Sequence, residues 1–109
     1  MRVETKNNML LIEGKVKNFS YTIEEILEFS NYCVLLLMDD EIPDNNIVAI
    51  GYNGEELWNI SEIIRFPYPE AYISISKESD SIFSAVTYNG VRFFVDTIQR
   101  KVVEKKITK

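Results

Sequence analysis

The chain has 109 residues, the size of a single domain, and its 46% hydrophobic and 27% charged residues are typical of a soluble globular protein. It carries a formal net charge of −5, a single cysteine and no histidine. The absence of histidine excludes Ser-His and Cys-His nucleophile pairs, and the lone Cys33 excludes an intrachain disulfide and a structural zinc site.

The apolar runs predict a cytoplasmic protein with no membrane partner. The longest run near the start, residues 9–12, is shorter than the core of a signal peptide, and residues 34–38 are too few to span a bilayer. A single cysteine also fits a reducing compartment.

The charge is unevenly distributed along the chain. Residues 22–81 carry two basic and thirteen acidic side chains, whereas residues 82–109 carry six basic and two acidic ones. Because the acidic middle would repel a phosphate backbone, we expect no nucleic-acid partner. The basic C-terminal segment fits a solvated edge strand that carries lysines.

Taken in chain order, the patterns predict mainly β-strands. Residues 2–16 predict two extended segments around a turn at Lys6-Asn7-Asn8. The further expected elements are a buried strand at 32–38, a loop at 39–46, hairpins at 47–60 and 81–96, and strands at 71–76 and 101–107.

Two segments carry helix signals. Thr22 and Glu25 fit a capping box, and apolar residues at helical spacing follow, so we expect a helix of about two turns within residues 20–29. Asn59 and Glu62 repeat the cap pattern before a second short turn.

A ten-residue stretch occurs twice, as "AIGYNGEELW" from position 49 and as "AVTYNGVRFF" 36 positions later. Each Asn-Gly pair predicts a two-residue type I′ turn with positive φ at both central residues. That register places Ala49 opposite Trp58 and Ala85 opposite Phe94, so a small residue faces a large aromatic in both hairpins.

These stretches, together with the matching segments "IEEILEF" and "ISEIIRF", predict an internal repeat of residues 23–59 and 60–95. We therefore expect one domain over residues 1–109, mainly β, with antiparallel meander sheets built from two related hairpin units and one or two short helical turns. The alternative explanation of the repeated motif is a ligand-binding box, which requires Tyr52 and Tyr88 side by side in a pocket.

Residues 47–60 resemble the strand–turn–strand element of a quinoprotein-type (PQQ-like) β-propeller blade, and residues 91–107 are similar to the same element, with Asp96 opening the turn. The resemblance implies meander geometry alone. The chain holds at most two blade-sized units, whereas propellers have at least four, and the turn at 97–100 lacks the usual glycine, so no cofactor residue carries over. The whole chain also resembles small uncharacterised bacterial proteins that use such strand pairs outside a propeller, which implies no function.

An acidic loop offers the clearest cluster of chemical groups. It contains Asp39, Asp40, Glu41, Asp44, Asn45 and Asn46. Oxygen ligands of this kind suit calcium, but the spacing departs from the EF-hand pattern, so we predict no metal site and leave cation binding by the loop open. No glycine-rich phosphate loop is present either, and we expect no cofactor.

The stretch "FPYPEAY" is rich in aromatic residues. Phe66, Tyr68 and Tyr72 form either an exposed anchor for a partner or a rigid turn that covers the end of the core.

An acidic module without catalytic equipment is expected to be a non-enzymatic binding protein. The specific hypothesis is a bacterial immunity-type inhibitor that masks a basic site on a toxin or nuclease, because charge complementarity speeds association. The expected partner-binding residues are Asp39, Asp40, Glu41, Asp44, Glu55, Glu56 and Tyr68. One alternative is a homo-oligomeric structural protein that completes its meander against a second copy; another is a carboxylate-dependent enzyme, which needs two acids facing each other across a cleft.

Overall fold

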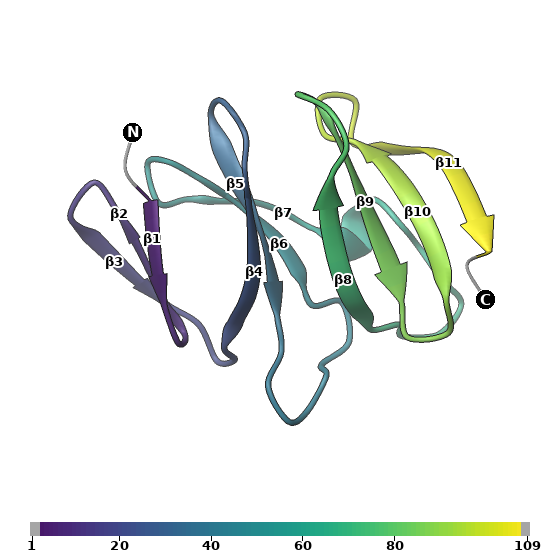
Figure 1. The fold of residues 1–109 in the computed structure, drawn as a ribbon, viewed down its shortest axis with the longest axis horizontal. Coiled ribbons are helices and arrows are strands. Elements are labelled where there is room, and N and C mark those ends of the chain that lie inside the picture. Colours follow the sequence, from purple (N-terminus) through teal and green to yellow (C-terminus); the bar gives the residue numbers. More distant parts are fainter. Residues whose placement is uncertain (1–2, 108–109) are drawn as a thin grey trace.

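In the computed structural model, which describes residues 3–107, the chain forms three antiparallel sheets that lie side by side along its long axis (Figure 1). The N-terminal sheet contains β1 (Val3–Lys6), β2 (Met9–Ile12) and β3 (Lys15–Asn18). The central sheet contains β4 (Ile23–Glu28), β5 (Tyr32–Leu37), β6 (Ile47–Gly51) and β7 (Glu56–Asn59). The C-terminal sheet contains β8 (Tyr72–Lys77), β9 (Ile82–Thr87), β10 (Val91–Asp96) and β11 (Lys101–Ile107). Within each sheet, every strand pairs with the next one in the chain, which confirms the predicted mainly β, antiparallel meander class.

The central sheet is buried on both faces, which explains the apolar run at residues 32–38. Side chains alternate along a strand, so Val34 and Leu36 of β5 pack toward the C-terminal sheet while Cys33 and Leu35 pack toward the N-terminal sheet. A strand covered on both sides has no solvated face, and its sequence is therefore continuously apolar.

The helix predicted within residues 20–29 is wrong, because Ile23–Glu28 form β4 and pair with β5. The register shifts just after Ile23, so Glu24 is the extra residue of a β-bulge. The bulge returns Ile23 and Ile26 to the same face, where both pack in the cluster with the N-terminal sheet. The apolar residues of this segment are thus spaced as in a helix because the strand contains one extra residue.

The two YNG turns are not of type I′. Positive φ occurs at Gly54 (+92°) and Gly90 (+87°) but not at Asn53 or Asn89. The Gly54 N–H donates to the Gly51 carbonyl at 2.8 Å, which makes tyrosine and asparagine the central residues of the turn and places the glycine after them in the left-handed region. This is the three-residue hairpin loop with a glycine bulge.

The different turn changes one of the two predicted pairings. Ala49 lies opposite Trp58, as expected, because a second bulge between Ala49 and Ile50 absorbs the one-residue shift. In the other hairpin the shift persists, and Ala85 lies opposite Phe93 instead of Phe94. A small residue still faces an aromatic one in both.

The two hairpins occupy different places in their sheets. The first joins the third and fourth strands of the central sheet, and the second joins the second and third strands of the C-terminal sheet. The segment "ISEIIRF" begins with the 3-10 helix η1 (Ile60–Glu62), whereas "IEEILEF" forms β4. The predicted cap at Asn59 is confirmed: its N–H donates to Glu62 Oε2 at 2.8 Å, and its Oδ1 accepts the Ser61 N–H at 2.9 Å.

Candidate functional site

The predicted partner-binding residues lie at two opposite ends of the central sheet. The loop of residues 38–46 joins β5 to β6 at one end, whereas Glu55 and Glu56 follow β6 at the other end. The four residue steps of β6 separate these ends by about 13 Å. Loop 38–46 therefore forms one candidate site with the segment 60–71, and we call this region the acidic end; Glu55 and Glu56 belong to the far end.

The carboxylates of the acidic end face solvent. Asp39, Asp40, Glu41 and Asp44 are all exposed. Asp39 Oδ1 accepts the Glu41 N–H at 3.1 Å, and the Asp39 N–H donates to the Glu41 carbonyl at 3.0 Å, so the turn is held locally. Within residues 3–107 the structure shows one ion pair, between Lys106 and Glu104 at 3.5 Å, and no loop carboxylate takes part in it.

The asparagines that close this loop are structural. Asn46 is buried; its Nδ2 donates to the carbonyls of Leu37 at 3.0 Å and Tyr72 at 2.8 Å, and its Oδ1 accepts the Tyr72 N–H at 2.8 Å. It thereby pairs with both backbone groups of Tyr72, as a neighbouring strand would, and ties β8 to the central sheet. The side-chain oxygen of Asn46 is thus committed to the protein backbone.

Asn45 attaches the loop by a hydrogen bond to the segment that follows η1. Its backbone is left-handed, with φ of 52°, its N–H donates to the Glu70 carbonyl at 2.8 Å, and its carbonyl accepts from Asn59 Nδ2 at 3.0 Å. In the described part of the chain, no group of three or more carboxylate or thiol side chains is arranged to hold a metal ion. Hydrogen bonds therefore hold the backbone of the acidic loop in place, while its carboxylates face solvent.

An exposed aromatic side chain lies at the same end. Tyr68 is 56% exposed and stacks on Phe66 with ring centroids 5.8 Å apart, and Phe66 in turn packs edge-on against Phe93 at 5.7 Å. Phe66 thus covers the end of the core while Tyr68 faces solvent. A hollow of about 420 Å³ beside them is lined by Asn45, Ser61, Ile64, Arg65, Phe66, Pro67, Tyr68 and Pro69.

Tyr72 does not belong to an exposed aromatic anchor, because it is completely buried. Its hydroxyl finds no hydrogen-bond partner among residues 3–107. Burial, together with the nearby Glu70 carboxylate, raises the pKa of Tyr72 above its ordinary value, so the phenol stays neutral.

Removing this hydroxyl is expected to leave stability unchanged or to raise it. Tyr72→Phe deletes a buried polar atom that makes no hydrogen bond, and we expect the free energy of unfolding to rise by 0 to about 1 kcal/mol in urea denaturation. Tyr52→Phe is the control, because its hydroxyl donates to the Phe29 carbonyl at 2.6 Å and its loss is expected to cost about 1 kcal/mol. A loss above about 1 kcal/mol for Tyr72→Phe would contradict the unpartnered hydroxyl.

Residues 1–107 match the family model described as "Domain of unknown function (DUF7957)". The chain belongs to this family. A search of curated proteins found no match. Residues 3–107 contain no helix with the length and hydropathy needed to cross a membrane.

The repeated YNG motif does not form a shared ligand box in this DUF7957 chain. Tyr52 lies at the far end, where a hollow of about 560 Å³ is also lined by Asn31 and Tyr32. Tyr88 is 68% exposed at the acidic end, where its N–H donates to the Ala71 carbonyl at 2.9 Å. The two tyrosines therefore lie at opposite ends of the stacked sheets.

Glu70 is a buried carboxylate that the sequence pattern did not reveal. Its Oε1 accepts the Ala71 N–H at 3.1 Å, and its Oε2 accepts from Asn89 Nδ2 at 3.4 Å. These bonds fix the turn after β9 against the segment before β8. Its sequence context, between a proline and an alanine, gave no signal of burial.

Cys33 is a core residue of the DUF7957 fold. It is fully buried, and burial raises the pKa of its thiol from 9.0 to about 12, with the Glu28 carboxylate acting in the same direction. Burial also raises the pKa of Tyr52 from 10.0 to about 12. Neither group is an activated nucleophile at neutral pH.

These raised pKa values predict a loss of stability at alkaline pH. Below pH 9 both states hold the protons; above it the unfolded chain releases the Cys33 proton, and above pH 10 the Tyr52 proton, while the folded chain retains them up to about pH 12. We expect a nearly constant melting temperature between pH 7 and 9 and a progressive fall from pH 9 to 12. Cys33→Val should reduce the fall between pH 9 and 10, and a melting temperature that stays flat through pH 11 would contradict the burial of these groups.

Proposed function

We propose that this chain is a non-enzymatic protein-binding module that uses its acidic end to bind a basic partner. The specific form is a bacterial, cytoplasmic, immunity-type inhibitor that covers a basic site on a toxin or nuclease. The observation that carries the proposal is the set of four exposed carboxylates, none in an ion pair within residues 3–107, beside the exposed Tyr68 ring.

The way this loop is held favours binding. Asn45 and Asn46 attach its C-terminal part to Glu70 and Tyr72, so little chain entropy remains to be lost when a partner binds. Unpaired surface carboxylates of one sign also accelerate encounter with a basic surface. A rigid aromatic ring beside them provides an apolar anchor of the kind enriched in interface hot spots.

The alternative of a carboxylate-dependent enzyme has less support. Such an enzyme needs two acids across a cleft. The hollows at the acidic end and the far end have no carboxylate in their lining, and a hollow on the N-terminal sheet has Glu4 alone.

We also propose that the relation to PQQ-like propeller blades is architectural and does not extend to a cofactor. Two four-stranded antiparallel meanders packed through one apolar cluster support this proposal. A propeller has at least four such blades around its axis, twice the number of four-stranded sheets here.

Capture from a lysate of the source cells tests the proposal with matched variants. The immobilised chain is expected to retain a basic protein at about 50 mM salt and to release it at about 500 mM. The variant D39N/D40N/E41Q/D44N keeps the size of each side chain and the Asp39 oxygen that accepts the Glu41 N–H, and is expected to lose the partner.

The control for this experiment is E55Q/E56Q, which removes charge at the far end and should capture as the unchanged chain does. Equal capture by the four-residue variant, or capture that salt does not weaken, would contradict the proposal. Circular dichroism melting of each variant checks that the fold is intact.

A further inference from the structure

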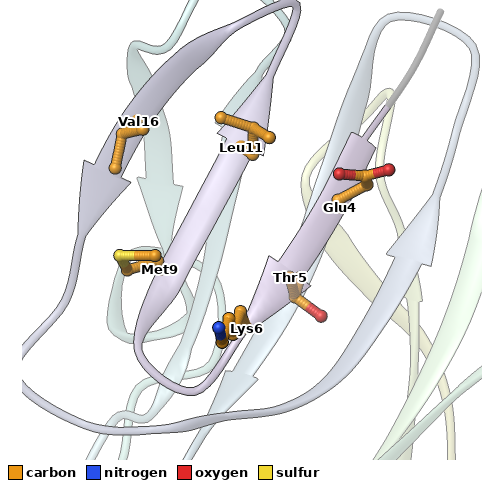
Figure 2. A pocket seen from close by; sticks show the side chains of 6 residues that line it. All are labelled: Glu4, Thr5, Lys6, Met9, Leu11 and Val16. Carbon is orange, nitrogen blue, oxygen red and sulfur yellow. The ribbon is translucent and has the colours of Figure 1, made fainter.

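The outer face of the N-terminal sheet is apolar at its centre. Met9, Leu11 and Val16 line a hollow of about 490 Å³ on this face, with Glu4 and Lys6 of β1 beside them (Figure 2). Met9 is 38% exposed and Val16 is more exposed still. The opposite face of the same sheet packs on the central sheet through Leu10 and Ile12.

The outer face of the C-terminal sheet differs, because its polar groups satisfy one another. Ser84 Oγ donates to Glu78 Oε2 at 2.7 Å and accepts from Arg92 Nη1 at 2.8 Å. Lys106 Nζ lies 5.4 Å from the centroid of the Phe94 ring. The exposed apolar residues of the C-terminal sheet lie apart on its two edge strands, Ile73 on β8 and Val103 and Ile107 on β11, whereas Met9, Leu11 and Val16 line one hollow.

We propose that the outer face of the N-terminal sheet binds the same face of a second copy of this chain. The two sheets would stack as the sheets within the chain already do, about 10 Å apart. The two-fold axis would lie between the sheets and run across the strands, so that β1 lies over the partner's β1 in the opposite direction.

The charges on β1 favour this arrangement. Glu4 and Lys6 are two residues apart on an edge strand and face outward, next to Leu11 and Met9 respectively. The proposed axis brings Glu4 against the partner's Lys6 and Lys6 against the partner's Glu4 along β1, with the apolar side chains of β2 and β3 beside these two pairs. A patch with one acid, one base and an apolar centre is thus complementary to itself.

Other stacking partners within the chain fit less well. Packing of the N-terminal face on the C-terminal sheet of another copy would remove Arg92 and Lys106 from water and would leave both copies with an unpaired outer face. On the outer face itself the charges of Glu4 and Lys6 balance, because Lys15 and Lys17 lie opposite Ile12 and Leu10 in the register and therefore belong to the other face. Contact between two such outer faces therefore brings no net like charge together.

The size of the face indicates a weak dimer. Three strands of four residues present a surface about 10 Å along the strands and about 10 Å across them, before side chains are added. Interfaces this small bury less than about 1,200 Å² and are typically transient. The dimer should therefore appear only as the concentration rises.

Sedimentation velocity across a concentration series, from about 10 μM to about 1 mM, tests the proposal. The unchanged chain is expected to shift from monomer to dimer, and Met9→Glu to stay monomeric because it places two carboxylates in the apolar centre. Ile73→Glu is the matched control: Ile73 is 37% exposed but lies on β8, and the variant should dimerise normally. A monomer at every concentration, a dimer that survives Met9→Glu, or a dimer equally lost in Ile73→Glu would overturn the proposal.

A charge exchange tests the two-fold arrangement itself. Glu4→Lys and Lys6→Glu each create like-charge pairs across the axis and should weaken dimerisation about tenfold. The double variant E4K/K6E restores opposite charges and should recover the original affinity. If the dimerisation affinity of E4K/K6E falls by as much as the losses of the two single variants added together, the proposed arrangement is overturned.

Discussion

Asn46→Ala is expected to lower the free energy of unfolding by about 3–5 kcal/mol, the largest loss we expect from a polar residue in this chain. The substitution removes three hydrogen bonds and leaves the buried N–H and carbonyl of Tyr72 without their partner. Unsatisfied buried backbone groups each cost about 1–3 kcal/mol. Urea denaturation followed by circular dichroism measures the change.

Two further variants test whether the loss of stability comes from the hydrogen bonds of Asn46 or from replacing any asparagine in the chain. Asn89→Ala, at an exposed turn position with one bond of 3.4 Å, is expected to change stability by less than about 0.5 kcal/mol. Asn46→Asp keeps the acceptor but loses both donors and buries a carboxyl group, so its destabilisation should grow from pH 4 to pH 7 as that group ionises. A stability loss below about 1 kcal/mol for Asn46→Ala would contradict its role in joining the sheets.

Trp58→Ala is expected to cost about 3–5 kcal/mol. Trp58 is buried between the central and C-terminal sheets, opposite Ala49 within its own sheet and stacked on Phe83 with ring centroids 6.0 Å apart. Its removal leaves a cavity that the small Ala49 side chain cannot fill. Thermal or urea unfolding followed by far-ultraviolet circular dichroism measures the loss without relying on indole fluorescence.

The neighbouring Leu57→Ala is the control for this variant. Leu57 is half-buried next to the bulge of the same hairpin, and its truncation is expected to cost about 1 kcal/mol. Equal losses for the two variants would show that the hairpin tolerates no change, and would contradict a specific role for the inter-sheet position of Trp58.

The sequence was informative where local patterns and burial agree. The apolar run at 32–38 is a doubly buried strand, the Asn59–Glu62 pair is a real cap, and an alanine faces an aromatic residue in both YNG hairpins. Each of these follows from side-chain volume, hydrogen-bonding capacity or alternation within a few residues.

β-Bulges explain why the sequence predicted the wrong secondary structure for β4 and the wrong turn type for the YNG hairpins. A single extra residue, Glu24, gives β4 the spacing of a helix, and the glycine bulge in each YNG turn moves the register by one. Sequence periodicity does not distinguish an inserted residue in a strand from one face of a short helix.

The candidate site was predictable in its charge but not in its geometry. Exposure of the loop carboxylates follows from their type, whereas the separation of Glu55 from that loop follows from the direction of β6. Asn46 resembled a metal ligand in sequence and is an inter-sheet hydrogen-bonding residue in the structure, because its partner Tyr72 is 26 positions away. Contacts at that distance leave no local pattern.

The most direct test of the proposed function is hydrogen–deuterium exchange of the chain with and without the basic protein that it captures. Slower amide exchange confined to residues 38–45 and 60–71 is the result we predict, with unchanged exchange at residues 52–56 and in β1–β3. Slower exchange centred on the far end, or no slowing at the acidic end, would contradict binding through the acidic loop and Tyr68.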